Sequence, residues 1–307
     1  MPFGGAVLSS TEALSLEQVP ESLAVIGGGY IGLELGTAFA KLGVQVIVIE
    51  AAHDILPQYD KDLVAPVAKR LADLGIEVMT GTRVNAMNGN QLELSRADSE
   101  TQTLTTEKVL VTVGRIPNSA SCAVDELQLT MTGDAIVIDE RCQTSMRGVY
   151  AIGDVTGEPM LAHRAMAQGQ MVAEIVAGKT RVWDKRCIPA VCFTDPEIVT
   201  AGLSPAEAIA AEHQITVGQF PLQANGRAMT MENDAGFVRV VAERDSGVIL
   251  GIQAVGQGVA ELSSAFALAL EMGACAEDIE ATIHAHPTLG ESFAEACMQV
   301  TGAALHI

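Results

Sequence analysis

The chain has 307 residues, of which 49% are hydrophobic, so it can bury a sizeable core and form about two domains, or three small ones. It carries 38 acidic residues against 18 Lys and Arg, which gives a net charge of -20. This charge disfavours a wide surface for binding nucleic-acid phosphates. The acidic surface either keeps the chain in solution or attracts a basic protein module.

The longest apolar stretches, such as residues 262–272, are too short or too interrupted by Ser and Glu to span a bilayer, which takes about 20 residues. The first residues lack the basic start, apolar block and cleavage site of a secretory signal. We therefore expect a cytoplasmic protein with no membrane association. The six cysteines are scattered through a long chain, which favours reduced thiols buried as small hydrophobic side chains.

Residues 1–20 are rich in Gly, Ser and Pro and are predicted to be a linker. Residues 23–26 and 44–49 are apolar runs typical of buried strands. Between them, apolar residues recur at helical spacing until Gly43, which ends the helix. The three segments predict a strand, a helix and a parallel strand joined by a right-handed crossover.

Further elements are expected in three domains, and the fold class is α/β with a Rossmann-like domain, a central domain and a C-terminal α+β domain. In the first domain, residues 21–117, we expect a helix at 60–74 and strands at 76–79, 91–94, 103–106 and 108–113. In the second, residues 118–186, we expect two strand-like runs within 135–152 and a helix at 162–177. In the third, residues 187–307, we expect strands at 191–193, 237–241 and 248–255 and helices at 262–272 and 289–300.

The motif Gly27-Gly28-Gly29-Tyr30-Ile31-Gly32 follows the first predicted strand and opens the first helix, which matches the G-x-G-x-x-G dinucleotide fingerprint. Glu50 ends the next strand 18 residues after Gly32, where it can accept hydrogen bonds from the adenosine ribose. A carboxylate there repels a 2'-phosphate, and no Arg follows in residues 51–53, so the motif predicts NAD rather than NADP. The alternative is a glycine turn without a ligand.

Two further segments, Val113-Gly114-Arg115-Ile116-Pro117-Asn118 and Gly148-Val149-Tyr150-Ala151-Ile152-Gly153-Asp154, resemble signatures of the pyridine nucleotide-disulfide oxidoreductases. The resemblance implies that Asp154 binds the ribityl chain of FAD and that the backbone near Met160 and Ala162 lies close to the flavin ring. By itself, Asp154 also fits a turn or helix-start residue after a strand.

The segment His284-Ala285-His286-Pro287-Thr288-Leu289-Gly290-Glu291 resembles the signature of the dihydrolipoyl dehydrogenases within that family. The resemblance implies that His286 is the acid/base for a thiol proton and that Glu291 orients its imidazole. These residue types suit the chemistry, because His titrates near neutral pH and a carboxylate partner fixes its tautomer.

Other interpretations of these residues remain. Thr288 and Glu291 also satisfy the T-x-x-E capping box, which gives Glu291 a structural role. The His-x-His spacing allows a metal, but no Cys or acid pair completes a ligand set, so we predict no metal site. Cys187 and Cys192 have the spacing of the family's redox disulfide but not its place in the chain, so we expect Cys192 in a buried strand and Cys187 in the preceding linker.

The resemblance also implies further residues and partners. It places Glu34 near the nicotinamide, although Glu34 also fits a solvated helix residue, and it adds Val84 and Gly114 as NAD contacts. It implies a homodimer in which His286 serves the other subunit's disulfide. The substrate would be dihydrolipoamide on the acyltransferase core of a 2-oxo acid dehydrogenase complex.

The resemblance extends over the whole chain, in the order of NAD, central and interface domains. The family begins with a flavin domain of about 150 residues that carries the redox disulfide, and we find no such motifs upstream of Leu23. We therefore expect the chain to be inactive by itself. The alternatives are a non-catalytic NAD-binding and dimerisation module, or another disulfide reductase of the same family.

Overall fold

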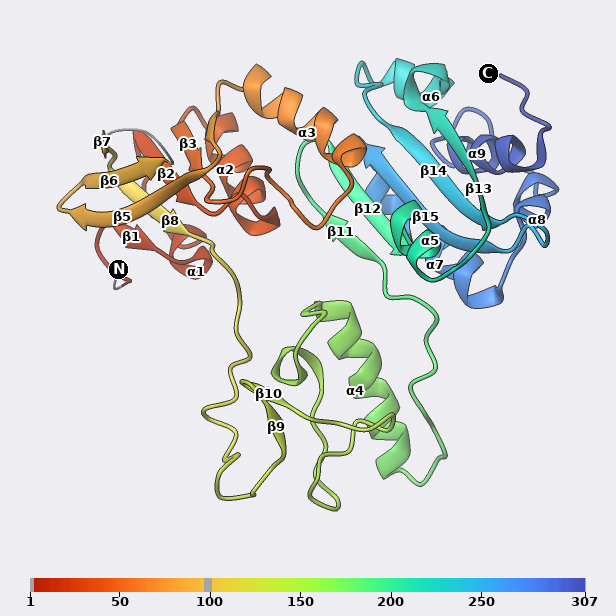
Figure 1. Ribbon diagram of the computed structural model, residues 1–307, viewed down its shortest axis with the longest axis horizontal. Coiled ribbons are helices and arrows are strands. Elements are labelled where there is room, and N and C mark those ends of the chain that lie inside the picture. The colour runs from red at the N-terminus through yellow and green to blue at the C-terminus, as the bar shows by residue number, and fades with distance from the viewer. Residues whose placement is uncertain (1–2, 97–100, 307) are drawn as a thin grey trace. The chain divides into compact units, whose positions relative to one another are not determined.

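The computed structural model describes residues 3–96 and 101–306. The chain divides into two compact units, one made of residues 1–114 and 189–307 and the other of residues 115–188 (Figure 1). Among the described residues, no helix is both long and apolar enough to cross a bilayer.

The first part of the larger unit is a parallel sheet of five strands in the order β1-β8-β2-β3-β4. This order places β2, which leads into the glycine motif, at the centre of the sheet. Four of the strands lie where the apolar runs predict them. The strands are β1 (Val7–Leu8), β2 (Ser22–Ile26), β3 (Gln45–Ile49), β4 (Glu77–Met79) and β8 (Lys108–Val111).

The segment predicted to be a linker belongs partly to this sheet, which corrects the prediction for residues 1–20. Val7 and Leu8 pair with Val109 and Leu110 of β8, and both side chains are buried. A short helix, α1 (Ser10–Ala13), follows and begins with a capping box formed by Ser9 and Glu12. A strand of two residues has no periodicity, so only its burial and pairing reveal it.

The two faces of the parallel sheet are covered by different elements. Successive side chains of a strand point to opposite faces, so neighbouring residues of β2 contact different elements. Leu23 and Val25 pack with residues of α2 (Tyr30–Lys41) and α3 (Lys61–Asp73). Ala24 and Ile26 pack with a three-stranded antiparallel sheet (Figure 1). The strands of that sheet are β5 (Thr82–Asn88), β6 (Gln91–Arg96) and β7 (Gln102–Thr105).

The second part of the larger unit is an antiparallel sheet of five strands in the order β11-β12-β15-β14-β13. Helix α7 packs on β12 and β15, and α9 packs on β13 and β14. The strands are β11 (Ala190–Cys192), β12 (Glu197–Gly202), β13 (Ile215–Pro221), β14 (Phe237–Glu243) and β15 (Ile249–Gly256). The helices are α5 (Pro205–Ala210), α6 (Gly226–Thr230), α7 (Ser263–Met272), α8 (Ala276–Glu280) and α9 (Glu291–Thr301).

The parallel and antiparallel sheets of this unit share one hydrophobic cluster. Cys192, Ile198, Phe237 and Val255 of the antiparallel sheet belong to the same buried cluster as the residues of α2 and α3. Arg239 of β14, whose side chain is only 6% exposed, forms ion pairs with Asp60 and Asp62 at the start of α3 and donates to Gln253 at 3.0 Å. A continuous core and a buried arginine therefore join the two sheets.

The smaller unit has little regular structure. It contains the hairpin β9 (Met131–Thr132) and β10 (Ala135–Ile136), the single turn η1 (Gly153–Thr156) and helix α4 (Ala162–Val176). Of the strand-like runs predicted within 135–152, the structure contains β10 and an isolated bridge between Gln143 and Tyr150. The carboxylate of Asp139 accepts the backbone N–H groups of Arg141 and Gln143, which turns the chain and interrupts the strand.

Helix α9 approaches β13 most closely at Gly218, where an added Cβ would lie 2.0 Å from the carbonyl oxygen of Ala296. We expect Gly218→Ala to force the helix away from the strand and to cost about 1–3 kcal/mol of stability, as overpacked cores do. The measurement is the midpoint of thermal unfolding.

Gly36 in α2 is the matched control, because a Cβ there would make ordinary contacts at 3.5 Å with Val25 and Val46. Gly36→Ala should leave the midpoint unchanged or raise it, since Ala favours a helix over Gly by about 1 kcal/mol. Equal midpoints for the two variants would contradict the close approach.

Candidate functional site

The glycine motif forms the tight turn between β2 and α2. Gly27 has φ +107°, and a Cβ at this position would lie 2.5 Å from the carbonyl oxygen of Thr112. A Cβ at Gly32 would lie 2.3 Å from the carbonyl oxygen of Gly27. Gly29 is the N-cap of α2, and Tyr30 and Ile31 form its first turn. The backbone N–H groups at this helix start form a site suited to phosphate.

Glu50 lies directly after β3 and beside the glycine motif. Its carboxylate accepts the backbone N–H of Gly28 at 2.6 Å and that of Ala52 at 2.6 Å. A Cβ at Gly28 would lie 2.9 Å from the side chain of Ile55 and 3.2 Å from Glu50, so this glycine is also required by close packing. The structure therefore brings together the acid and the second glycine, which are 22 residues apart in sequence.

Thr112 joins the ends of two neighbouring strands at the same place. Its hydroxyl donates to the carbonyl oxygens of Ile26 and Gly27, each at 3.2 Å. Thr112 belongs to none of the motifs recognised in the sequence. It follows directly after β8 and lies two residues before Gly114, and this position in the sequence could have identified it. Gly114 follows with φ +139°, a backbone conformation that favours glycine.

Glu34 is a half-buried residue of α2 rather than a solvated one. Its carboxylate accepts the backbone N–H of Phe193 at 2.8 Å. Burial raises the pKa of the Glu34 carboxyl, and the hydrogen bond from Phe193 partly counteracts that shift. Val84 lies in β5 and packs partly buried against the cluster that includes Ala24 and Ile26.

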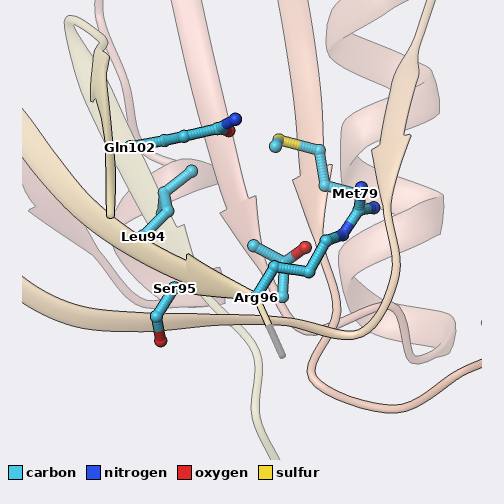
Figure 2. A pocket seen from close by; sticks show the side chains of 6 residues that line it. Met79, Leu94, Ser95, Arg96 and Gln102 are labelled. Atoms are coloured by element: carbon cyan, nitrogen blue, oxygen red, sulfur yellow. The ribbon is translucent and has the colours of Figure 1, made fainter. Parts of the chain in front are cut away.

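Several cavities open in the larger unit. A cavity of about 560 Å³ lies between α3 and the loop that follows Glu50, and its lining includes His53 and Lys61. Figure 2 shows a much smaller cavity, of about 10 Å³, lined by residues of β4 to β7 that include Met79 and Arg96. The small cavity has the volume of about one water molecule, so it is a packing void rather than a ligand site.

The smaller unit holds the residues that the resemblance assigns to FAD. Asp154 lies in η1, and its carboxylate forms an ion pair with Arg115 at 2.8 Å. The backbone N–H of Met160 donates to Glu158, and Ala162 begins α4. Arg115 lies in the segment 113–118, which resembles a family signature. Its ion pair with Asp154, 39 residues away, could not be predicted from either segment alone.

Two buried polar residues of α4 fasten the loop that carries Asp154. The Arg164 guanidinium donates to the carbonyl oxygens of Gly157 and Pro159 and to the hydroxyl of Thr156, at 2.7–3.0 Å. One turn further along α4, Gln168 accepts the backbone N–H of Gly153 at 2.8 Å. These contacts preform the loop. Neither residue was predicted from the sequence, although an arginine in an otherwise weakly charged helix could have indicated a buried contact.

His286 and Glu291 form a hydrogen-bonded pair at the start of α9. His286 Nδ1 lies 2.9 Å from Glu291 Oε1, and the His286 side chain is 78% exposed. Because Nδ1 is engaged by Glu291, Nε2 is the ring nitrogen left to exchange a proton. Burial raises the pKa of Glu291, but hydrogen bonds from Thr288 and His286 outweigh it, and the net pKa is lowered.

Of the two hydrogen bonds of the capping box predicted for Thr288 and Glu291, one is present. Glu291 Oε2 accepts the backbone N–H of Thr288 at 2.7 Å, as a capping glutamate would. The Thr288 hydroxyl instead donates to the carbonyl oxygen of Ala285, and the helix N-cap is Gly290. Glu291 therefore serves both the loop and the imidazole, with one oxygen for each.

The two histidines of the motif differ in their surroundings. His284 is half-buried, and its Nε2 lies 3.1 Å from the carbonyl oxygen of Ile279. Its imidazole thus contacts the last turn of α8. His286 is the histidine that combines a carboxylate partner with an exposed ring.

Cys192 lies in β11 and is fully buried, as predicted. Burial raises the pKa of its thiol to about 11, so the thiol is protonated at neutral pH and is unsuited to act as a nucleophile. Within residues 3–96 and 101–306, no group of three or more His, Cys, Asp or Glu side chains is arranged to hold a metal ion.

Comparison with known proteins identifies the family. Residues 2–169 match the pyridine nucleotide-disulphide oxidoreductase model, and residues 188–297 match the dimerisation domain of that family. The chain is 55% identical over its whole length to a dihydrolipoyl dehydrogenase of Pseudomonas aeruginosa and covers 66% of that protein. It is 40% identical over 99% of its length to a dihydrolipoyl dehydrogenase of Geobacillus stearothermophilus, of which it also covers 66%. The chain thus spans slightly less than two thirds of these relatives.

Solved structures agree with this assignment. LpdA from Mycobacterium tuberculosis superposes with a TM-score of 0.86 at 26% identity, over 95% of this chain and 64% of that one. The flavoprotein disulfide reductase RclA from Escherichia coli, in its Cu(II) complex, superposes with a TM-score of 0.87 at 26% identity, over 96% of this chain and 67% of that one. The predicted α/β fold class with a C-terminal dimerisation domain is confirmed, and the chain belongs to the pyridine nucleotide-disulphide oxidoreductase family.

Proposed function

We propose that this chain is the NAD-binding, central and dimerisation part of a dihydrolipoyl dehydrogenase. The observation that carries the proposal is the contact of 2.9 Å between His286 Nδ1 and Glu291 Oε1. It occurs in a chain that is 55% identical to a dihydrolipoyl dehydrogenase. The domains proposed are residues 21–117 for NAD, 118–186 for the central domain and 187–307 for the interface.

The reaction converts dihydrolipoamide and NAD⁺ into lipoamide, NADH and a proton. His286, held by Glu291, accepts the proton of a substrate thiol at Nε2, so that the sulfur can act as a thiolate. Glu291 stabilises the resulting imidazolium with its negative charge. If bound, FAD would supply the two-electron carrier between NAD⁺ and the dithiol that forms when dihydrolipoamide reduces the redox disulfide, and Asp154 with the backbone at Met160 and Ala162 would help to hold it.

The glycine motif and Glu50 fit an NAD site. Glu50 accepts hydrogen bonds from the adenosine ribose with the lone pairs that its bonds to the backbone N–H groups of Gly28 and Ala52 leave available. The start of α2 at Gly29 receives the pyrophosphate. Glu34, Val84 and Gly114 are proposed as further contacts, with Glu34 near the nicotinamide.

The residues of the smaller unit fit part of a flavin site. Asp154 accepts a ribityl hydroxyl, and the backbone of Met160 and Ala162 lies near the ring. The ion pair between Asp154 and Arg115 already holds the Asp154 carboxylate in a defined position. Buried Arg164 and Gln168 hold the loop in a defined conformation.

The partners proposed are a second copy of the chain and dihydrolipoamide carried by the acyltransferase core of a 2-oxo acid dehydrogenase complex. The large exposure of His286 supports a site that a partner subunit completes. The dimerisation domain matched by residues 188–297 supports the homodimer. We propose the cytoplasm as its location.

The chain should bind NAD more tightly than NADP, by about tenfold or more, because Glu50 gains hydrogen bonds from one and repels the 2'-phosphate of the other. Isothermal titration calorimetry with both nucleotides measures this preference. Glu50→Ala should weaken NAD binding and reduce the preference. Glu77→Gln, an exposed acid on the neighbouring strand β4, should change neither affinity. Tighter binding of NADP would refute the assignment.

In a protein completed by a flavin domain, His286→Gln should lower kcat for dihydrolipoamide oxidation by about 10²- to 10⁴-fold, the usual contribution of a positioned acid/base. Glu291→Gln should have a smaller effect. His284→Gln is the matched control, because its imidazole bonds to a backbone carbonyl, and it should affect kcat least. A larger loss of kcat in the His284 variant than in the His286 variant would show that the proton transfer does not belong to His286.

A further inference from the structure

We propose that Asp195, in the turn between β11 and β12, is a positioning residue for Glu34 and so for the nicotinamide end of bound NAD. This inference rests on the NAD site proposed above. It assigns a role in cofactor binding to a turn of the dimerisation domain, 159 residues away from Glu34 in sequence.

The first observation is the hydrogen bond that the turn makes to Glu34. The backbone N–H of Phe193 donates to Glu34 Oε1 at 2.8 Å. Burial disfavours the charged form of Glu34, and this N–H is the group that offsets the effect. The orientation of the Glu34 carboxylate therefore depends on where Phe193 lies.

The second observation is the pair of cations that hold the same turn. Asp195 Oδ2 lies 2.9 Å from Lys41 Nζ at the end of α2 and 3.0 Å from Arg70 Nε of α3. The Asp195 side chain is 17% exposed, so these charges are only partly screened by solvent. Glu34 and Lys41 are seven residues apart, which is two helical turns, and so lie on one side of α2. The turn thus contacts α2 at Glu34 and Lys41, and it contacts α3 at Arg70.

The third observation is the set of hydrogen bonds within the turn itself. Thr194, which is buried, donates its hydroxyl to the carbonyl oxygen of Pro196 at 2.7 Å, and the Cys192 thiol lies 3.7 Å from the same hydroxyl. A turn fixed internally in this way moves as one body. Release of Asp195 therefore displaces Phe193 along with it.

The effect should be confined to one end of the nucleotide. The adenosine end is served by Glu50, whose carboxylate accepts the backbone N–H groups of Gly28 and Ala52, and neither residue belongs to the turn. ADP-ribose retains the adenosine and the pyrophosphate but lacks the nicotinamide. It therefore separates binding at Glu50 from binding near Glu34.

The experiment measures the dissociation constants of NADH and ADP-ribose for the full 307-residue chain and its variants by calorimetry. Asp195→Asn should raise the Kd for NADH about three- to tenfold, within the range found for residues that act through a neighbour, and leave that for ADP-ribose unchanged. Lys41→Met should do the same. Because the Lys41 side chain is 49% exposed, this second variant keeps the test decisive if Asp195→Asn unfolds.

Two controls accompany these variants. Lys41→Arg keeps the positive charge and should bind both ligands as the parent does. Glu174→Gln removes a carboxylate that also pairs with one Lys and one Arg, Lys179 and Arg181, but in the smaller unit, and it should change neither constant.

The outcomes separate the two proposals. Equal losses for NADH and ADP-ribose, or no loss for either, in both Asp195→Asn and Lys41→Met would overturn the positioning role and leave the NAD site standing. Failure of the parent chain to bind either ligand would overturn the NAD site itself, and the positioning role with it.

Discussion

One buried cluster, shared by α2, α3 and the antiparallel sheet, determines how the larger unit is built. Cys192, Ile198 and Phe237 contribute to it from the antiparallel sheet, and Leu33 contributes from α2. Apolar side chains at this junction gain their burial only if the two sheets stay together. The ion pairs of Asp195 and Arg239 lie beside this cluster and restrict the sheets further. Glu34 owes its hydrogen bond from Phe193 to this packing of the two sheets, and not to residues of its own helix.

The sequence predicted most elements of the parallel sheet, because buried strands and amphipathic helices have clear periods. It missed β12 and β13 for identifiable reasons. β13 contains Gly218 and ends in Pro221, both of which are signals against a strand. β12 begins directly after Pro196 and ends in glycine, so its apolar run is short. Their place in the sheet is decided by pairing with β14 and β15, which no local pattern reveals.

The candidate site was predictable where its residues are close in sequence. His286 and Glu291 are five residues apart, so their contact could be expected from the motif. The contact of Glu34 with Phe193 spans 159 residues and uses a backbone N–H, which carries no sequence signal. The ion pair of Asp154 with Arg115 joins two motifs that were recognised separately. Single residues were thus easier to predict than the pairs they form.

Helix α2 connects the glycine motif to the turn of the dimerisation domain. Its 12 residues span about 18 Å, and a hydrogen-bonded helix of this length bends little. The N–H groups at its start face the proposed pyrophosphate site, and Lys41 at its end binds Asp195. A rotation of the helix about its axis would therefore disturb both ends together. Because the turn of the dimerisation domain holds Lys41, it also restrains the orientation of the helix start at Gly29.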